Sequence, residues 1–119
     1  MRSTLLRLAP LALLITAGVA GVELLQYFGS ERIGRELAAS AKAGDILMLS
    51  SVDCTYCREA REWLQSHRVA FDECFIERDA RCAAVYQALQ APGTPTLQVR
   101  GQTQVGFSAE RVAQALRRG

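Results

Sequence analysis

The chain has 119 residues, of which 50% are hydrophobic and 22% are charged, and its formal net charge is +2. This length holds one small domain and little else. A charge so close to zero, with no basic stripe, excludes a nucleic-acid-binding protein. Four cysteines in so short a chain indicate disulfides if the protein is exported, and metal binding or catalysis if it is not.

The first part of the chain is apolar. Residues 8–28 contain one charged residue, Glu23, and are long enough to cross a bilayer at about 20 residues per crossing. Arg2 and Arg7 precede this segment, and that bias keeps the N-terminus in the cytoplasm and places the rest outside. The sequence therefore predicts a membrane anchor through residues 8–28.

A cleaved secretory signal is the alternative interpretation, since small residues at Gly18 and Ala20 suit a cleavage site. In both cases residues 1–29 are a targeting segment, and residues 30–119 form a domain outside the cytoplasm. That domain would be periplasmic in a bacterium, or secreted after cleavage. A buried core helix is the least favoured interpretation of the apolar segment.

The rest of the chain alternates between helical and strand patterns. Residues 46–49 are a continuous apolar run, typical of a strand buried on both faces of a parallel or mixed sheet. We expect helices over 30–43, 54–67, 79–89 and 108–118, and strands over 46–49, 69–76, 96–99 and 102–105. The order α-β-α-β-α-β-β-α predicts an α/β domain.

The sharpest chemical signal is the C-x-x-C pair of Cys54 and Cys57, which lies between the buried strand and a helix start. A thiolate is the reactive form of cysteine, and a helix N-terminus stabilises an anion by about 0.3–1 kcal/mol. Cys54 is placed to be that nucleophile, and Cys57, one turn later, can resolve a mixed disulfide. An inert structural disulfide and half of a zinc site are the alternatives.

A zinc site would need a second C-x-x-C or paired histidines. The remaining cysteines have the spacing C-x7-C, and the single histidine, His67, lies late in the predicted helix. The sequence therefore predicts no metal. We expect Trp63 to lie in the core, and Arg58 and Arg61 to be solvated or paired with acids of their own helix. The alternative is that these two arginines help to hold a thiolate or an acidic substrate.

Pro95 directly precedes a predicted strand, where proline is disfavoured in a central position. A cis Thr94–Pro95 bond there would turn the chain sharply and bring the Thr94 backbone toward Cys54. Cys74 and Cys82 fall at one end of the predicted sheet, and export favours a second disulfide between them. Two buried free thiols and a redox relay to the first pair remain open.

Residues 31–118 resemble the glutaredoxin branch of the thioredoxin superfamily. Residues 51–57 are similar to its active-site segment, residues 94–96 to its cis-proline loop, and residues 105–110 to the turn before its last helix. The resemblance implies a thioredoxin-like three-layer fold with a four-stranded mixed sheet, here preceded by a hydrophobic helix.

The resemblance also implies roles for individual residues. Cys54 is the nucleophile and Cys57 the resolving thiol. The backbone of Thr94, beside Pro95, is the pairing edge for substrate, and Tyr56 lines the substrate groove.

Three residues depart from the family pattern: Thr55 replaces a usual proline, Ser51 a frequent lysine that helps to hold glutathione, and Val105 the first of two glycines. These departures argue against glutathione as the preferred partner, and no other cofactor is implied. We expect a thiol–disulfide oxidoreductase acting on protein or small-thiol disulfides with a redox partner that the sequence does not identify. A glutathione-dependent glutaredoxin and a non-catalytic thioredoxin-like binding module are the alternatives, and the sequence leaves the direction of electron flow open.

Overall fold

The computed structural model describes residues 2–119, with side chains from residue 6 onward, so the Arg2 side chain used in the orientation argument lies outside the described part. The chain forms four helices and four strands over this range. Their bounds are α1 (Arg2–Ser40), β1 (Ile46–Ser50), α2 (Thr55–Ser66), β2 (Asp72–Phe75), α3 (Ala80–Ala88), β3 (Thr96–Val99), β4 (Gln102–Val105) and α4 (Ala109–Arg118).

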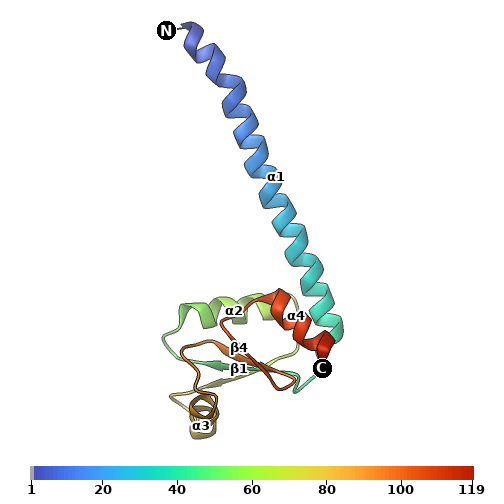
Figure 1. Ribbon diagram of the computed structural model, residues 1–119, viewed down its shortest axis with the longest axis vertical. Coiled ribbons are helices and arrows are strands. Elements are labelled where there is room, and N and C mark those ends of the chain that lie inside the picture. The colour runs from blue at the N-terminus through green and yellow to red at the C-terminus, as the bar shows by residue number, and fades with distance from the viewer. Residues whose placement is uncertain (1) are drawn as a thin grey trace. The chain divides into compact units, whose positions relative to one another are not determined.

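The four strands form one mixed sheet in the order β2-β1-β3-β4. β1 runs parallel to β2 and antiparallel to β3, and β3 and β4 form a hairpin. Helices α2 and α4 cover one face of the sheet and α3 covers the other (Figure 1). The expected thioredoxin-like three-layer fold with a four-stranded mixed sheet is confirmed.

The core lies on the face covered by α2 and α4. Side chains of alternate residues of β1 and β3 point there and pack against both helices and against the last turns of α1. Buried members of this cluster include Leu37, Ile46, Met48, Leu64, Leu97, Val99, Val112 and Leu116. Leu49, also fully buried, points to the α3 face, so β1 is buried on both faces as its apolar run predicts.

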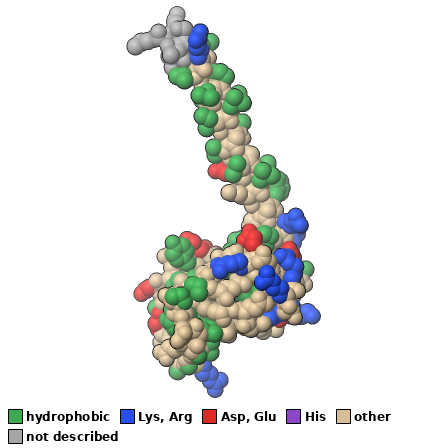
Figure 2. Space-filling view, viewed as in Figure 1, with side chains coloured by type: hydrophobic (Ala, Val, Ile, Leu, Met, Phe, Trp, Pro, Cys, Tyr) green, Lys and Arg blue, Asp and Glu red, His purple; other side chains and the backbone are tan. Residues whose placement is uncertain are grey.

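The chain divides into two compact units, Met1–Glu31 and Arg32–Gly119. In the first unit, all side chains from Leu6 to Gly29 are exposed, and Figure 2 shows hydrophobic side chains along this part of α1. A helix over Leu6–Ser40 is apolar and long enough to cross a membrane, by length and composition alone.

Two element boundaries differ from the sequence-based expectation. A separate helix over 30–43 was expected, but α1 continues without a break through residue 30 and ends at Ser40. A single glycine, Gly29, costs a helix only about 1 kcal/mol, and no proline follows to end it. The second strand is also shorter than 69–76, because the chain is still turning away from α2, with a positive φ of 56° at Arg68.

Candidate active site

Cys54 and Cys57 lie at the N-terminus of α2 and form a disulfide, with their Cα atoms 5.2 Å apart. Cys54 is the N-cap residue, in an extended conformation, and its Sγ accepts the backbone N–H of Cys57 at 3.1 Å. Unpaired N–H groups and the helix dipole make this position favourable for negative charge. The local structure therefore suits a thiolate at Cys54.

The two cysteines differ in their exposure to solvent. Cys57 is fully buried, whereas Cys54 is partly exposed. An incoming disulfide can therefore reach Cys54 but not Cys57. The two cysteines are chemically alike, so this difference comes from their positions on the first turn of α2.

The loop before β3 lies against Cys54. The Thr94–Pro95 peptide bond is cis, and the Thr94 carbonyl oxygen is 3.5 Å from Cys54 Sγ. Pro95 is buried and its carbonyl accepts the N–H of Gly106 at 2.8 Å, which ties this loop to the segment after β4. The structure thus brings Cys54 next to the Thr94–Pro95 loop, which is 40 residues away in sequence.

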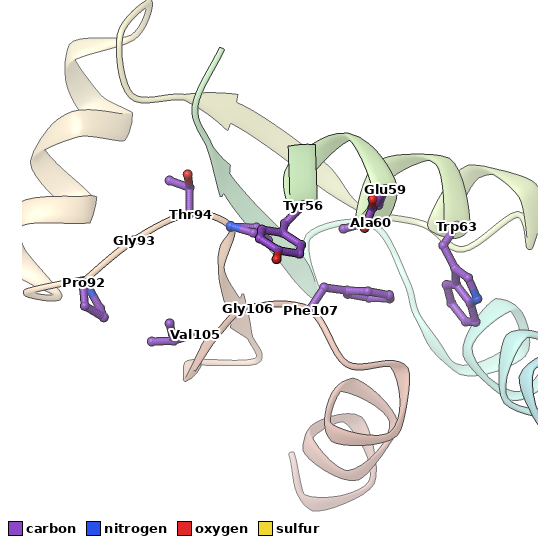
Figure 3. Close-up of a pocket in the computed structure, with 11 residues that line it drawn as sticks. Tyr56, Glu59, Ala60, Trp63, Pro92, Gly93, Thr94, Val105, Gly106 and Phe107 are labelled. Atoms are coloured by element: carbon purple, nitrogen blue, oxygen red, sulfur yellow. The ribbon is translucent and has the colours of Figure 1, made fainter. Parts of the chain in front are cut away.

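A groove with a volume of about 540 Å³ lies beside this loop. Figure 3 shows Tyr56, Glu59 and Trp63 along the α2 side and Phe107 from the segment before α4. The groove is lined by Tyr56, Glu59, Ala60, Trp63, Pro92, Gly93, Thr94, Pro95, Val105, Gly106 and Phe107. Its lining is mainly apolar and contains one charged residue among the described side chains.

Tyr56 is 73% exposed at the mouth of this groove. Trp63 was expected in the core, but it lies at the core's edge, where its ring is 5.4 Å from the ring of Phe107 and 4.1 Å from that of His67. Sequence reasoning missed Phe107 as a groove residue, because its position depends on the pairing of β4 with β3.

A smaller pocket of about 290 Å³ lies on the other side of Cys54 and includes Arg58 and Arg61. The expected pairing of Arg61 with an acid of its own helix is wrong. Its guanidinium makes two contacts to the Glu73 carboxylate, at 2.6 and 3.0 Å, and so joins α2 to β2. The carboxylate of Glu73 raises the pKa of Arg61 further above its ordinary value.

Glu77, which follows β2, was not identified from the sequence. Its carboxylate accepts a hydrogen bond from the Ser51 hydroxyl and another from the Val52 N–H, the latter at 3.2 Å. The Ser51 hydroxyl is the main cause of a lowered pKa at Glu77. Ser51 and Val52 belong to the loop that leads to Cys54, so this loop is held by a residue 25 positions away.

A second disulfide joins Cys74 to Cys82, with Cα atoms 5.9 Å apart. Cys74 is paired with Leu49 of β1 across the sheet, and Cys82 lies in the first turn of α3. The N-cap of that helix is Asp79, as the sequence predicts, and its carboxylate accepts the N–H of Arg81 at 2.8 Å. The bridge therefore fastens the start of α3 to the sheet.

The fold and the paired cysteines define a thioredoxin-like protein with a C-x-x-C disulfide at a helix N-terminus. Residues 46–103 match the family model for glutaredoxin, and this segment contains both disulfides and the cis-proline loop. This segment of the chain is thus similar to glutaredoxin. No curated protein matches the chain.

Solved structures agree with the thioredoxin-like fold. A mutant of the thioredoxin-like protein BC3987 has 27% sequence identity and a TM-score of 0.55, over 62% of this chain and 96% of that one. The glutaredoxin from Methanosarcina mazei Go1 has 18% identity and a TM-score of 0.53, over 65% and 82%. Methanoredoxin from Methanosarcina acetivorans has 21% identity and a TM-score of 0.51, over 66% and 90%.

Proposed function

We propose that this protein is a thiol–disulfide oxidoreductase in which Cys54 attacks the substrate and Cys57 resolves the intermediate. The observation that carries the proposal is the asymmetry of the pair: Cys54 is partly exposed and its Sγ accepts a helix N-terminal N–H at 3.1 Å, whereas Cys57 is fully buried. A purely structural disulfide closing so short a loop would stabilise the fold little.

The reaction consists of two displacements. In the reduced protein, the Cys54 thiolate attacks one sulfur of a substrate disulfide, and the other substrate sulfur leaves as a thiolate. Cys57 loses its proton and attacks Cys54 Sγ, which releases the second substrate sulfur and closes the Cys54–Cys57 disulfide. Two electrons pass to the substrate, and the reverse sequence oxidises a dithiol substrate.

The groove supports protein disulfides as substrates. Aromatic and proline side chains line it next to Cys54 and the Thr94 backbone, which suits an extended polypeptide segment with an apolar side chain. Glutathione carries two carboxylates, and the one charged side chain in the lining is Glu59, of the same sign. We therefore propose that protein disulfides are preferred to glutathione mixed disulfides.

We also propose that the domain works outside the cytoplasm, tethered by residues 8–28. The support for this is the exposed apolar surface of that segment, its length, and the Arg residues that precede it. An exported domain is also in the compartment where disulfides persist.

Trapping experiments test the roles of the two cysteines. In Cys57→Ser, the mixed disulfide at Cys54 cannot be resolved, so it should accumulate with a scrambled, disulfide-bonded protein substrate. In Cys54→Ser it should not form. Both are measured on non-reducing gels after acid quenching. Accumulation in Cys54→Ser instead would reverse the assignment, and no adduct in either variant, with no reductase activity in the parent chain, would favour a binding module.

A further inference from the structure

The loop that delivers Cys54 depends on a carboxylate from outside it. The two carboxylate oxygens of Glu77 accept hydrogen bonds, one from the Val52 N–H at 3.2 Å and one from the Ser51 hydroxyl. Both partners lie two or three positions before Cys54. Because Glu77 is 25 residues from Val52 in sequence, no local turn imposes this contact; it exists only while the segment after β2 keeps its position.

The second disulfide encloses that segment. Cys74 and Cys82 bracket Glu77, so their bridge closes a loop of chain that contains it. The start of the loop is also fixed by the Ile76 N–H, which donates to the Ser50 carbonyl at 3.0 Å. A bridge across a short loop restricts the positions that its residues can take. Glu77 thus lies inside the loop closed by the Cys74–Cys82 disulfide and also contacts the loop before Cys54.

We propose that Glu77 is a positioning residue for Cys54, and that the Cys74–Cys82 disulfide acts on the active site through it. This inference rests on the proposed function, since it takes Cys54 as the attacking thiol. The carboxylate holds residues 51–52 in place and also puts a negative charge beside the loop. A negative charge disfavours a nearby thiolate.

The Ser51 hydroxyl and Val52 N–H lower the pKa of Glu77, so this carboxylate is ionised throughout the range in which a thiol titrates. The contact therefore orders the loop before Cys54 but raises the pKa of the Cys54 thiol. Loss of the Glu77 charge should lower the pKa of Cys54, whereas a purely structural role for Glu77 would leave the pKa of Cys54 unchanged.

The test measures the pKa of Cys54 from the pH dependence of its alkylation by iodoacetamide in the full chain. All variants carry Cys57→Ser, so that Cys54 stays a thiol while the Cys74–Cys82 bridge stays oxidised without reductant. Glu77→Gln should lower the pKa and raise the alkylation rate at pH 6 about two-fold, the scale of effect expected for removing one charge in water. Asp72→Asn, an exposed acid at the other end of β2, is the matched control and should change neither.

A double-mutant cycle tests the link to the disulfide. Replacing Cys74 and Cys82 together by serine should shift the pKa of Cys54 in the same direction as Glu77→Gln, because the carboxylate is released from the loop. In a chain that already carries Glu77→Gln, the two serines should add no further shift. Fully additive shifts, or an Asp72→Asn effect as large as that of Glu77→Gln, would overturn the proposal.

Ser51→Ala keeps the test decisive if the chain without the bridge fails to fold. This variant removes one of the two hydrogen bonds to Glu77, so the carboxylate stays charged but is held to the loop only by the Val52 N–H and can move away from it, while the disulfide is kept. It should lower the pKa of Cys54 by part of the Glu77→Gln shift, and an unchanged value would refute positioning by Glu77. None of these measurements requires turnover, so failure of the oxidoreductase proposal would be seen separately, as absent disulfide exchange with the pKa shifts intact.

Discussion

At the scale of single residues, Arg100 joins three parts of the chain far from the active site. Its guanidinium donates to the Leu116 carbonyl at 2.6 Å and to the Asp45 carboxylate at 3.1 Å, and its backbone N–H donates to the Asp45 carbonyl at 2.9 Å. The Arg100 side chain, followed by the Lys42 N–H, lowers the pKa of Asp45 below its ordinary value. The ion pair therefore couples folding to pH.

We predict that Asp45→Asn destabilises the domain at pH 7 but not in strong acid. A carboxylate whose pKa is lower in the folded state stabilises the fold above its unfolded pKa of about 3.9, and this contribution is lost as the pH falls through the folded value. Urea unfolding of both chains should give different midpoints at pH 7 that converge near about pH 2. A constant gap at all pH values would contradict the assignment of the lowered pKa to this pair.

The sequence was enough to predict site residues whose positions depend only on neighbours close in the chain. The spacing of Cys54 and Cys57 after an apolar strand is enough to place both on the first turn of a helix, and the structure has them there. Glu77 was missed because its contact with Ser51 depends on the register between β1 and β2 and on the path of the chain after β2. No residue pattern within one element carries that information.

At the scale of elements, α1 approaches α2 closely at one position. A Cβ atom built on Gly34 would lie 2.0 Å from Cδ2 of the His67 ring, which is stacked on Trp63 and whose Nδ1 is 2.9 Å from the Trp63 carbonyl oxygen. The ring is held by this stacking, so it cannot swing away freely. Glycine is therefore required by packing rather than by backbone conformation.

We predict that Gly34→Ala destabilises the domain by about 1–3 kcal/mol, the usual cost of inserting a methyl group into a packed contact. Gly29→Ala is the matched control in the same helix, because a Cβ there meets nothing within 4 Å and alanine favours helix. It should be neutral or slightly stabilising in thermal unfolding of the detergent-solubilised chain. Adding His67→Ala to Gly34→Ala should recover part of the lost stability. If no stability is recovered, the new methyl group does not clash with the His67 ring.

The sequence predicted β3 and β4 with their observed bounds and the starts of α3 and α4 to within one residue, because turn residues and cap residues act locally. Asp79 and Ser108 each accept an N–H of the first turn that follows them. The continuity of α1 was not predicted, because serine favours the start of a helix, although a helix also tolerates it in its interior when both flanking segments are helical. Local preference cannot decide between a new helix and a continued one.

At the scale of the whole molecule, we predict that the native protein retains its N-terminal segment. The apolar surface of residues 8–28 would remain in the bilayer, so the protein should resist extraction by alkaline carbonate. N-terminal sequencing of the protein from its native cell should find the residues before Gly21 still attached. A mature chain beginning at Gly21 would show a cleaved signal, and a chain without residues 1–29 should appear in the soluble fraction.

The pairing of all four cysteines has a consequence for chemical durability. Cys54, Cys57, Cys74 and Cys82 are bound in two disulfides, and the chain has no further cysteine. Peroxide attacks thiolates and drives them through sulfenic to sulfinic acid, which thiols do not reverse. The oxidised form offers no thiolate to this chemistry. Irreversible oxidation of cysteine by peroxide is then confined to the interval in which Cys54 is reduced. A protein that is kept oxidised between reactions with its substrates would therefore lose its cysteines slowly in a peroxide-rich compartment.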